Sequence, residues 1–287
     1  MAYHAFMTLQ WVVERLPRRA AYALAIVIGR IAFLTARKAR KRLTFNLKRA
    51  LPDAPDSQIR LLVWRNFRNH AKAYIDLMQL PRADPSDLAK LITIQDIENL
   101  DAALRPGKGV IVVSIHMGSW EFVAAAASAN IAPFSLFAEV LEPKELYEWY
   151  KLTRARLGVG VLPLTRGGLR QVTRALDHNE IVVTAIDRDV LGTGASMDFF
   201  GHRTSIPIGP AAIALRRGAA LMPLCLYRQP DDTYICETSP PIFAEASGTV
   251  RDDVVRITSQ VLRILEGYIR ERPDQWHMPH SIWPDSP

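Results

Sequence analysis

One imidazole and two acids stand where apolar runs of the sequence end. His116 follows the run GVIVVSI (109–115) within the hexapeptide HMGSWE, and Asp187 follows EIVVTAI (180–186) within DRD. Glu121 lies five residues after His116, and the intervening glycine permits a turn that brings its carboxylate back toward the imidazole. A neutral imidazole held at one ring nitrogen by a carboxylate can deprotonate a hydroxyl with the other. The pattern predicts acyl transfer to an alcohol, with Glu121 or Asp187 orienting His116.

Other kinds of catalytic site fit this sequence less well. It contains no HExxH pair for a zinc protease, no G-x-S-x-G turn for a serine hydrolase, and no Walker or G-x-G-x-x-G loop. Cys225 and Cys236 belong to no C-x-x-C or Cys/His pairing, so we expect no metal and no disulfide framework. Both thiols are expected to be buried in paired strands of a protein from a reducing compartment.

The runs that carry His116 and Asp187 belong to an α/β pattern. Continuous apolar runs separated by helix-length spacers predict a central, mostly parallel sheet flanked by helices. We expect strands at 109–115, 133–140, 180–186 and 219–227, an antiparallel return at 233–238, and helices at 144–157, 167–178, 209–217 and 250–272. The carboxyl ends of parallel strands meet at one edge of a sheet, which is where open α/β folds bind ligands.

The start of the chain is helical and carries the surplus of positive charge. Residues 5–80 have helical patterns with breaks at 51–57 and 80–87, where Asp56 or Ser57 can cap the following helix. We divide the chain into a basic amphipathic helical segment (1–85) and an α/β catalytic core (86–287), integrated into one domain. The formal net charge is +7, yet residues 1–50 hold eleven Lys or Arg and a single acid.

A basic leading segment indicates a polyanionic surface, either nucleic acid or anionic lipid. Apolar residues recur there at spacings of three and four, as the helical periodicity requires; they are Trp11, Val12, Leu16, Leu24, Val27, Ile28, Ile31 and Leu34. Since the bases interleave with aliphatic side chains, we expect a helix in a membrane interface and no nucleic acid partner. Ordinary amphipathic core helices are the alternative. The segment from Ala20 to Ala36 contains Arg30 and is short for a bilayer span, so spanning is not favoured.

These residues resemble a known family. A histidine followed five positions later by an acid is the signature of the lysophospholipid acyltransferase superfamily, and H-x-G-x-W-E is similar to its branch of bacterial lipid A late acyltransferases and phosphatidylinositol mannoside acyltransferases. The resemblance extends over nearly the whole chain, through RLTFNLKRAL (42–51), TRGGLRQ (165–171), DRD (187–189), the stretch 198–223 and PDQWHMPH (273–280). The ending is more similar to the mannoside enzymes.

The resemblance implies roles for individual residues. His116 would be the general base toward the acceptor hydroxyl, Glu121 the family's paired acid, and Asp187 the acid of a second motif that orients the imidazole in the mannoside branch. Arginines of the segments LTRARLG and TRGG would bind the thioester or an acceptor phosphate. We therefore expect substrate-binding residues in these arginine segments and in the motifs HMGSWE and DRD. They are Arg154, Arg156, Arg166, Arg188, Ser119 and Trp120.

The chemistry also requires groups that the sequence places near the histidine. Main-chain N–H groups of 117–119, before the following helix, are expected to hold the oxyanion. An acyl chain needs an apolar tunnel, for which Trp120, Phe122 and Phe134 are candidates, although each also suits an ordinary core.

The function expected is therefore that of a membrane-associated O-acyltransferase. It would move a fatty acyl chain from acyl-CoA or acyl carrier protein to a sugar hydroxyl of a phosphatidylinositol mannoside-like or lipid A-like glycolipid, without a further cofactor. It would act at the cytoplasmic face of the bacterial inner membrane, as a peripheral or monotopic protein on an anionic surface. A non-catalytic lipid-binding protein on the same fold and an acyl-thioester hydrolase are the alternatives.

Overall fold

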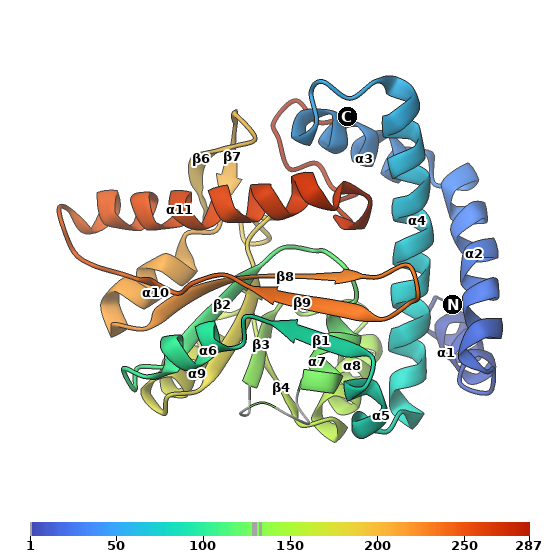
Figure 1. Ribbon diagram of the computed structural model, residues 1–287, viewed down its shortest axis with the longest axis horizontal. Coiled ribbons are helices and arrows are strands. Elements are labelled where there is room, and N and C mark those ends of the chain that lie inside the picture. Colours follow the sequence, from blue (N-terminus) through green and yellow to red (C-terminus); the bar gives the residue numbers. More distant parts are fainter. Residues whose placement is uncertain (1, 128–130, 132–133) are drawn as a thin grey trace.

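A central β-sheet crosses the middle of the protein (Figure 1), in a computed structural model that describes residues 2–127, 131 and 134–287. Its strands follow the order β1-β9-β8-β2-β5-β3-β4, with β10 paired to β8. They are β1 (Ile92–Gln95), β2 (Val110–Ser114), β3 (Phe134–Ala138), β4 (Val159–Pro163), β5 (Ile181–Ala185), β8 (Ala220–Arg228), β9 (Tyr234–Thr238) and β10 (Ile242–Phe243). The five strands from β8 to β4 are mutually parallel, and β9 returns antiparallel to β8.

The α/β class with a mainly parallel sheet is confirmed. The four expected parallel strands and the antiparallel return are present; residue 133 of the run 133–140 lies outside the described residues. β1 and β4 were not expected. β1 is a short outer strand with alternating exposed residues, and β4 contains Gly160 and Pro163, two residues that strands disfavour. A hairpin of β6 (Ala195–Phe199) and β7 (His202–Ile206) was also missed; it turns at Phe200-Gly201, where both residues have positive φ.

Helices cover both faces of the sheet. On one face, α9 (Arg166–Asp177), α10 (Gly209–Arg217) and α11 (Val250–Glu271) pack against Ile111 and Val182. On the other face, α6 (Glu98–Leu104) and α7 (Trp120–Ala127) pack against Val112 and Val183. The remaining short elements are α5 (Pro85–Ala89), α8 (Lys144–Arg156) and the 3-10 turns η1 (Leu80–Arg82) and η2 (Pro273–Gln275). Successive apolar residues of one strand thus serve two separate cores.

Four helices form the beginning of the chain: α1 (Ala2–Val13), α2 (Arg18–Thr35), α3 (Arg37–Ala50) and α4 (Asp56–Gln79). Figure 1 shows α2 and α4 side by side at the edge of the molecule, and small residues of α2 allow this approach. A Cβ on Gly29 would lie 3.1 Å from the carbonyl oxygen of Phe67, so a larger residue would push the helices apart. The expected capping of α4 was wrong: the helix begins after Pro55, and Asp56 pairs with Lys48.

A buried polar cluster ties α2 and α4 to the sheet. The carboxylate of Asp76 in α4 accepts hydrogen bonds from Arg228 at the end of β8, Tyr22 in α2 and Tyr234 in β9. Arg228 also donates to the hydroxyl of Tyr22 at 2.8 Å. The four side chains form a charge pair closed by two phenols, so the N-terminal helices and the core are joined by more than apolar packing.

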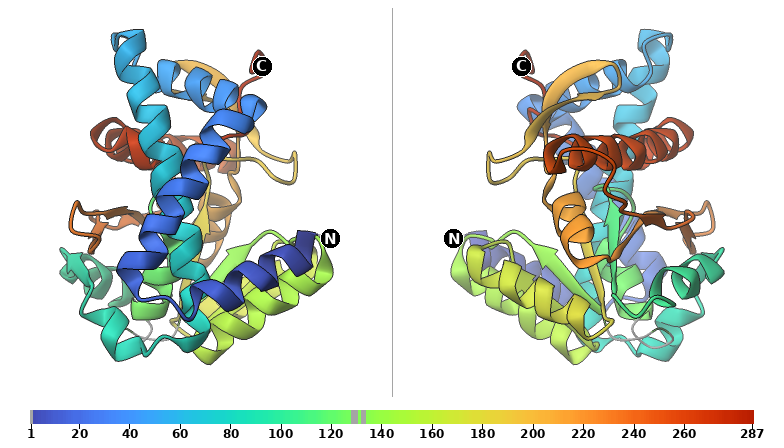
Figure 2. Two further views of the ribbon diagram at one scale, coloured as in Figure 1. Left: turned by 90° about the vertical axis from the view of Figure 1, so that its right-hand side faces the viewer. Right: turned by 90° about the vertical axis from the view of Figure 1, so that its left-hand side faces the viewer.

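Figure 2 shows α1 and α2 at the surface of the molecule. Several large apolar side chains of these helices are in contact with solvent. Val27, Ile31 and Leu34 are 55–59% exposed, whereas Leu24 turns toward the contact with α4. In the described part of the chain, no individual helix combines the length and apolar character of a membrane span, although α2 and α3, joined at a 90° bend, meet these criteria as a pair.

Candidate active site

The register of two neighbouring strands brings His116 and Asp187 together. In the parallel pair β2–β5, Ser114 lies opposite Ala185. His116 follows two residues after Ser114, and Asp187 follows two residues after Ala185. The imidazole Nδ1 lies 2.7 Å from Oδ1 of Asp187, and the main-chain N–H of His116 donates to Oδ2 at 2.8 Å. Of the two acids that the sequence left open, Asp187 contacts the imidazole.

Asp187 fixes the charge and the tautomer of this imidazole. Burial opposes ionisation of Asp187, yet the charge and hydrogen bonds of His116 outweigh it and lower the pKa of the carboxyl. Burial likewise opposes the cationic form of His116, but Asp187 outweighs it and raises the imidazole pKa. Because an ionised carboxylate only accepts hydrogen bonds, Nδ1 carries the proton of the neutral ring and Nε2 keeps its lone pair. The side chain lines a cleft and is 48% exposed, so a substrate hydroxyl can reach it.

The segment after η2 forms hydrogen bonds to Asp187 and to the main chain of His116. The Trp276 indole N–H donates to Oδ2 of Asp187 at 2.9 Å, and the main-chain N–H of His277 donates to the carbonyl of His116 at 2.8 Å. The sequence singled out PDQWHMPH for its resemblance but assigned no role to these residues. A tryptophan and two histidines within five residues of a loop were the signal for this contact.

Two further imidazoles, those of His70 and His277, lie close to His116. The rings of His70 and His277 stack with 3.3 Å between centroids, and Nδ1 of His277 lies 2.6 Å from Oδ1 of Asn66. Burial lowers the pKa of His70 to about 3 and lowers that of His277 as well. Both rings are therefore neutral at physiological pH and add no positive charge beside His116.

The depressed pKa of His70 should make the protein sensitive to acid. Its folded-state pKa of about 3 lies below the ordinary 6.5, so only the unfolded chain takes up this proton between those values. Stability is then complete above pH 6.5 and falls with decreasing pH, by up to about 1.4 kcal/mol per pH unit from this residue. Urea unfolding between pH 4 and 7 should show a smaller slope with pH for His70→Phe. Equal slopes in both proteins would contradict the assignment.

Glu121 lies at the same cleft, but its partner is an arginine. It belongs to the first turn of α7, and Arg154 in the last turn of α8 binds it with two hydrogen bonds, Nε at 2.8 Å from Oε2 and Nη2 at Oε1. Both side chains line the cleft. Burial opposes the charge of Arg154, yet Glu121 raises its pKa. Glu121 therefore fixes a cation in the cleft wall.

The other expected substrate-binding residues are divided by the structure. Arg166 at the start of α9 and Arg188 beside Asp187 line the cleft, and Arg188 pairs with Glu139. Arg156 is exposed on α8 and is not among the described residues of the cleft wall. Ser119 is buried, and its hydroxyl has no hydrogen-bond partner in the described part of the chain.

The turn between His116 and Glu121 depends on Gly118. Its φ is +67°, and a Cβ there would lie 2.5 Å from the carbonyl oxygen of Leu226. The expectation that the amides of 117–119 hold an oxyanion needs correction, because Met117 donates to Ile115 (2.8 Å) and Gly118 to Gln275 (3.4 Å). Two of these three amides already have acceptors.

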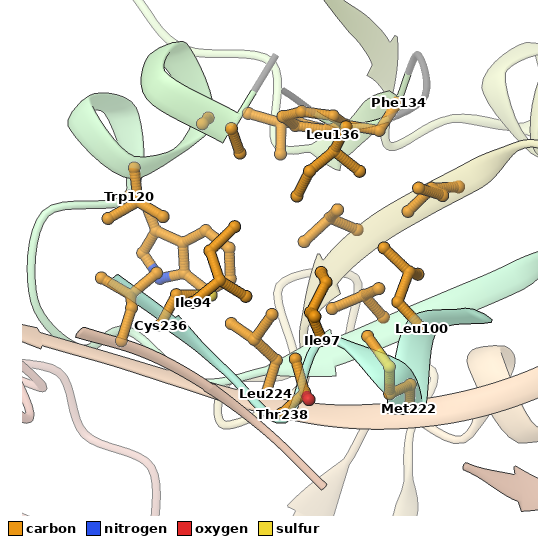
Figure 3. A pocket seen from close by; sticks show the side chains of 18 residues that line it. Ile94, Ile97, Leu100, Trp120, Phe134, Leu136, Met222, Leu224, Cys236 and Thr238 are labelled. Atoms are coloured by element: carbon orange, nitrogen blue, oxygen red, sulfur yellow. The ribbon is translucent and has the colours of Figure 1, made fainter. Parts of the chain in front are cut away.

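Two hollow spaces lie on either side of Trp120 and share part of their walls. The cleft at the carboxyl edge of the sheet has a volume of about 510 Å³ and combines His116, Arg154 and Arg188 with apolar walls. A second, much smaller cavity of about 70 Å³, here called the apolar cavity, lies between the sheet and α6–α7 (Figure 3). Trp120, Leu136 and Val183 line both spaces.

The apolar cavity extends along β3 and β5 from the cleft toward the beginnings of these strands. Leu136 and Val183 border the cleft, and Phe134 and Ile181 lie two residues closer to the strand beginnings. Phe134 and Trp120 thus both line the apolar cavity. Phe122 instead packs on Tyr234, with 5.0 Å between ring centroids.

No described residues form a group of three His, Cys, Asp or Glu side chains able to bind a metal ion. Cys225 and Cys236 are buried on the paired strands β8 and β9. Burial raises the pKa of Cys236 to about 12, so this thiol stays protonated.

Comparison with known proteins places this site in a family context. The model of the bacterial lipid A biosynthesis acyltransferase family matches residues 2–284. The phosphatidylinositol mannoside acyltransferase of Mycolicibacterium smegmatis is 31% identical over 80% of this chain and 74% of its own length. That of Mycobacterium tuberculosis (H37Rv) is 29% identical over 85% and 77%. The lipid A biosynthesis lauroyltransferase of Escherichia coli (K12) is 23% identical over 96% and 89%.

The match to the family covers the helical start, the sheet and the C-terminal segment that contacts His116. The resemblance found in the sequence is thereby confirmed. The chain belongs to the bacterial lipid A biosynthesis acyltransferase family and is an acyltransferase.

Proposed function

We propose that the protein transfers a fatty acyl chain from an acyl thioester to a sugar hydroxyl of a membrane glycolipid, with His116 as the general base. The observation that carries this proposal is the His116–Asp187 pair at a cleft that shares wall residues with an apolar cavity. Mannosides of phosphatidylinositol are the favoured acceptors, since the relative at 31% identity is named for them. Lipid A-like acceptors are the alternative within the same family.

The residues can move each proton of the reaction. Nε2 of His116 takes the proton of the acceptor hydroxyl while its oxygen attacks the thioester carbonyl, and Asp187 stabilises the resulting imidazolium. The tetrahedral intermediate then expels the thiolate of the donor, which receives the proton from His116. The new ester and a free thiol leave, and His116 returns to its starting state without a covalent enzyme intermediate.

The two spaces suit the two ends of the donor. The lining of the apolar cavity is hydrocarbon apart from Trp120, Met222, Cys236 and Thr238, so its chemistry suits the end of an acyl chain. The cleft presents Arg166 and Arg188, which suit the phosphates of coenzyme A, of acyl carrier protein or of the acceptor headgroup. The thioester carbonyl would then lie beside His116, where Trp120 borders both spaces.

An activity assay separates this function from its alternatives. Purified protein is incubated with labelled palmitoyl-CoA or palmitoyl carrier protein and bacterial lipid, with and without the glycolipid fraction. Acyl transfer predicts a labelled glycolipid that appears only when that fraction is present. Release of labelled fatty acid without acceptor would indicate a hydrolase, and binding without turnover would indicate a lipid-binding protein; either result would overturn the proposal.

The exposed side of α1–α3 would bring the cleft to the inner membrane surface. Arg37, Lys38 and Lys41 are exposed next to the apolar residues of α2. Arg40 and Arg42 already donate hydrogen bonds to main-chain oxygens, those of Phe33 and Pro287. Near an anionic surface each free base contributes on the order of 1 kcal/mol to binding.

Replacing Arg37, Lys38 and Lys41 with Gln should therefore weaken binding to anionic vesicles by at least about tenfold and reduce its salt dependence. Co-sedimentation with vesicles containing phosphatidylglycerol measures both effects. A matched control replaces Arg216, Arg251 and Arg263 of α10 and α11, which are exposed on other helices and carry the same total charge. Equal losses in the two variants would indicate a general charge effect and contradict a specific membrane-facing side.

A further inference from the structure

The indole of Trp276 completes the hydrogen bonding of the Asp187 carboxylate. Oδ2 accepts the main-chain N–H of His116 and Nε1–H of Trp276, which leaves Oδ1 to the imidazole Nδ1. Trp276 is fully buried and belongs to a loop more than eighty residues away along the chain. The contact therefore exists only because the C-terminal segment packs behind the site.

The indole itself is held from several sides. The main-chain carbonyl of Trp276 accepts a hydrogen bond from Nδ2 of Asn66 in α4 at 2.8 Å. The main chains of Met117 and Trp276 also form an isolated β-bridge. The rings of Phe199 and Phe200 both lie 6.0 Å from the indole, measured between centroids. A donor so firmly placed can restrain a carboxylate, whose terminal torsion is otherwise broad.

We propose that Trp276 is a positioning residue for proton transfer, one that holds Asp187 in the rotation that presents Oδ1 to His116. This inference rests on the proposed role of His116 as general base. The indole N–H also directs the positive end of its dipole at the Asp187 carboxylate and stabilises its negative charge. Because this donor offsets part of the attraction between Asp187 and a protonated His116, it keeps His116 neutral over a wider range of pH.

Trp276→Phe keeps an aromatic ring and removes this donor. The imidazole pKa of His116, followed by NMR titration, should shift to higher pH. The acid limb of kcat/KM should move with it, and kcat should fall about tenfold with little change in KM for the donor. If the phenylalanine variant fails to fold, benzothienylalanine at position 276 tests the same point, because sulfur replaces the N–H in a ring of nearly equal shape.

Trp283→Phe is the matched control. Trp283 is also buried and stacks on Phe199 at 5.9 Å, but its Nε1 has no hydrogen-bond partner among the described residues. This variant should leave the His116 titration unchanged. A Trp276 variant whose His116 pKa stays the same or falls, or a Trp283 variant with an equal rise, would overturn the inference. The NMR titration needs no turnover, so its outcome is distinct from a failure of the proposed function, which retained activity in a His116 variant would reveal.

Discussion

His116→Ala is expected to reduce kcat/KM for acyl transfer by about 10³-fold or more, because in the proposed mechanism this side chain accepts the hydroxyl proton and passes it to the leaving thiolate. The side chain is half exposed in the cleft, so its loss leaves the packed core intact. Labelled glycolipid formed per minute measures the effect. Circular dichroism and vesicle binding should match those of the unaltered protein. Substantial retained turnover would remove His116 from the base role.

Two further variants test whether His116 acts with Asp187. Asp187→Asn keeps the shape of the side chain but removes the charge that holds Nδ1–H, and should cost about as much activity as the loss of the base. Glu121→Gln should cost less, since its carboxylate binds Arg154 and not the imidazole. The exposed His178, at the end of α9, provides a control whose alanine variant should retain full activity. A larger loss in Glu121→Gln than in Asp187→Asn would reverse the assignment of the two acids.

Asp76→Ala is expected to reduce the free energy of unfolding by about 3 kcal/mol, because it removes the buried partner of Arg228 and leaves this charge only Asp232, whose Oδ1 lies 3.3 Å away. The Arg228 side chain is 5% exposed, so water cannot replace the lost carboxylate. Two phenols, Tyr22 and Tyr234, lose their acceptor at the same time. Urea unfolding followed by circular dichroism measures the change.

The control for this variant is a pair in contact with solvent. Asp177→Ala removes the partner of Arg217, where both side chains are about half exposed, and should change stability by less than about 1 kcal/mol. Asp76→Asn retains hydrogen-bonding atoms without the charge and should fall between the two. If Asp76→Ala destabilised no more than Asp177→Ala, the buried cluster would not be a main link between the N-terminal helices and the sheet.

The sequence predicted the centre of the sheet because local patterns determine it. β2 and β5 begin with continuous Val and Ile, and their last residues, Ser114 and Ala185, each lie two positions before His116 or Asp187. Parallel neighbours with that property place His116 and Asp187 at one edge, so the pair could be anticipated before any coordinates.

What the sequence could not show depends on contacts between distant segments. Whether Glu121 or Asp187 reaches the imidazole was undecided, because the answer lies in Arg154, which enters from a different helix. Trp276 and His70 contact the site through packing of the last segment and α4, and no spacing in the chain encodes that contact. The amides of Met117 and Gly118 looked available until their acceptors were seen.

The register of β2 and β5 has a consequence for how such an enzyme can diversify. The reacting pair is placed by the main-chain ladder of two central strands, whereas the cleft rim is built from connecting segments such as those of Glu139, Val190 and Leu191. Under the proposed function, substitutions in the rim would alter which glycolipid is accepted without disturbing the contact between His116 and Asp187. Selection could act on the two properties almost independently, which fits a family whose members are named for mannosides in one lineage and for lipid A in another.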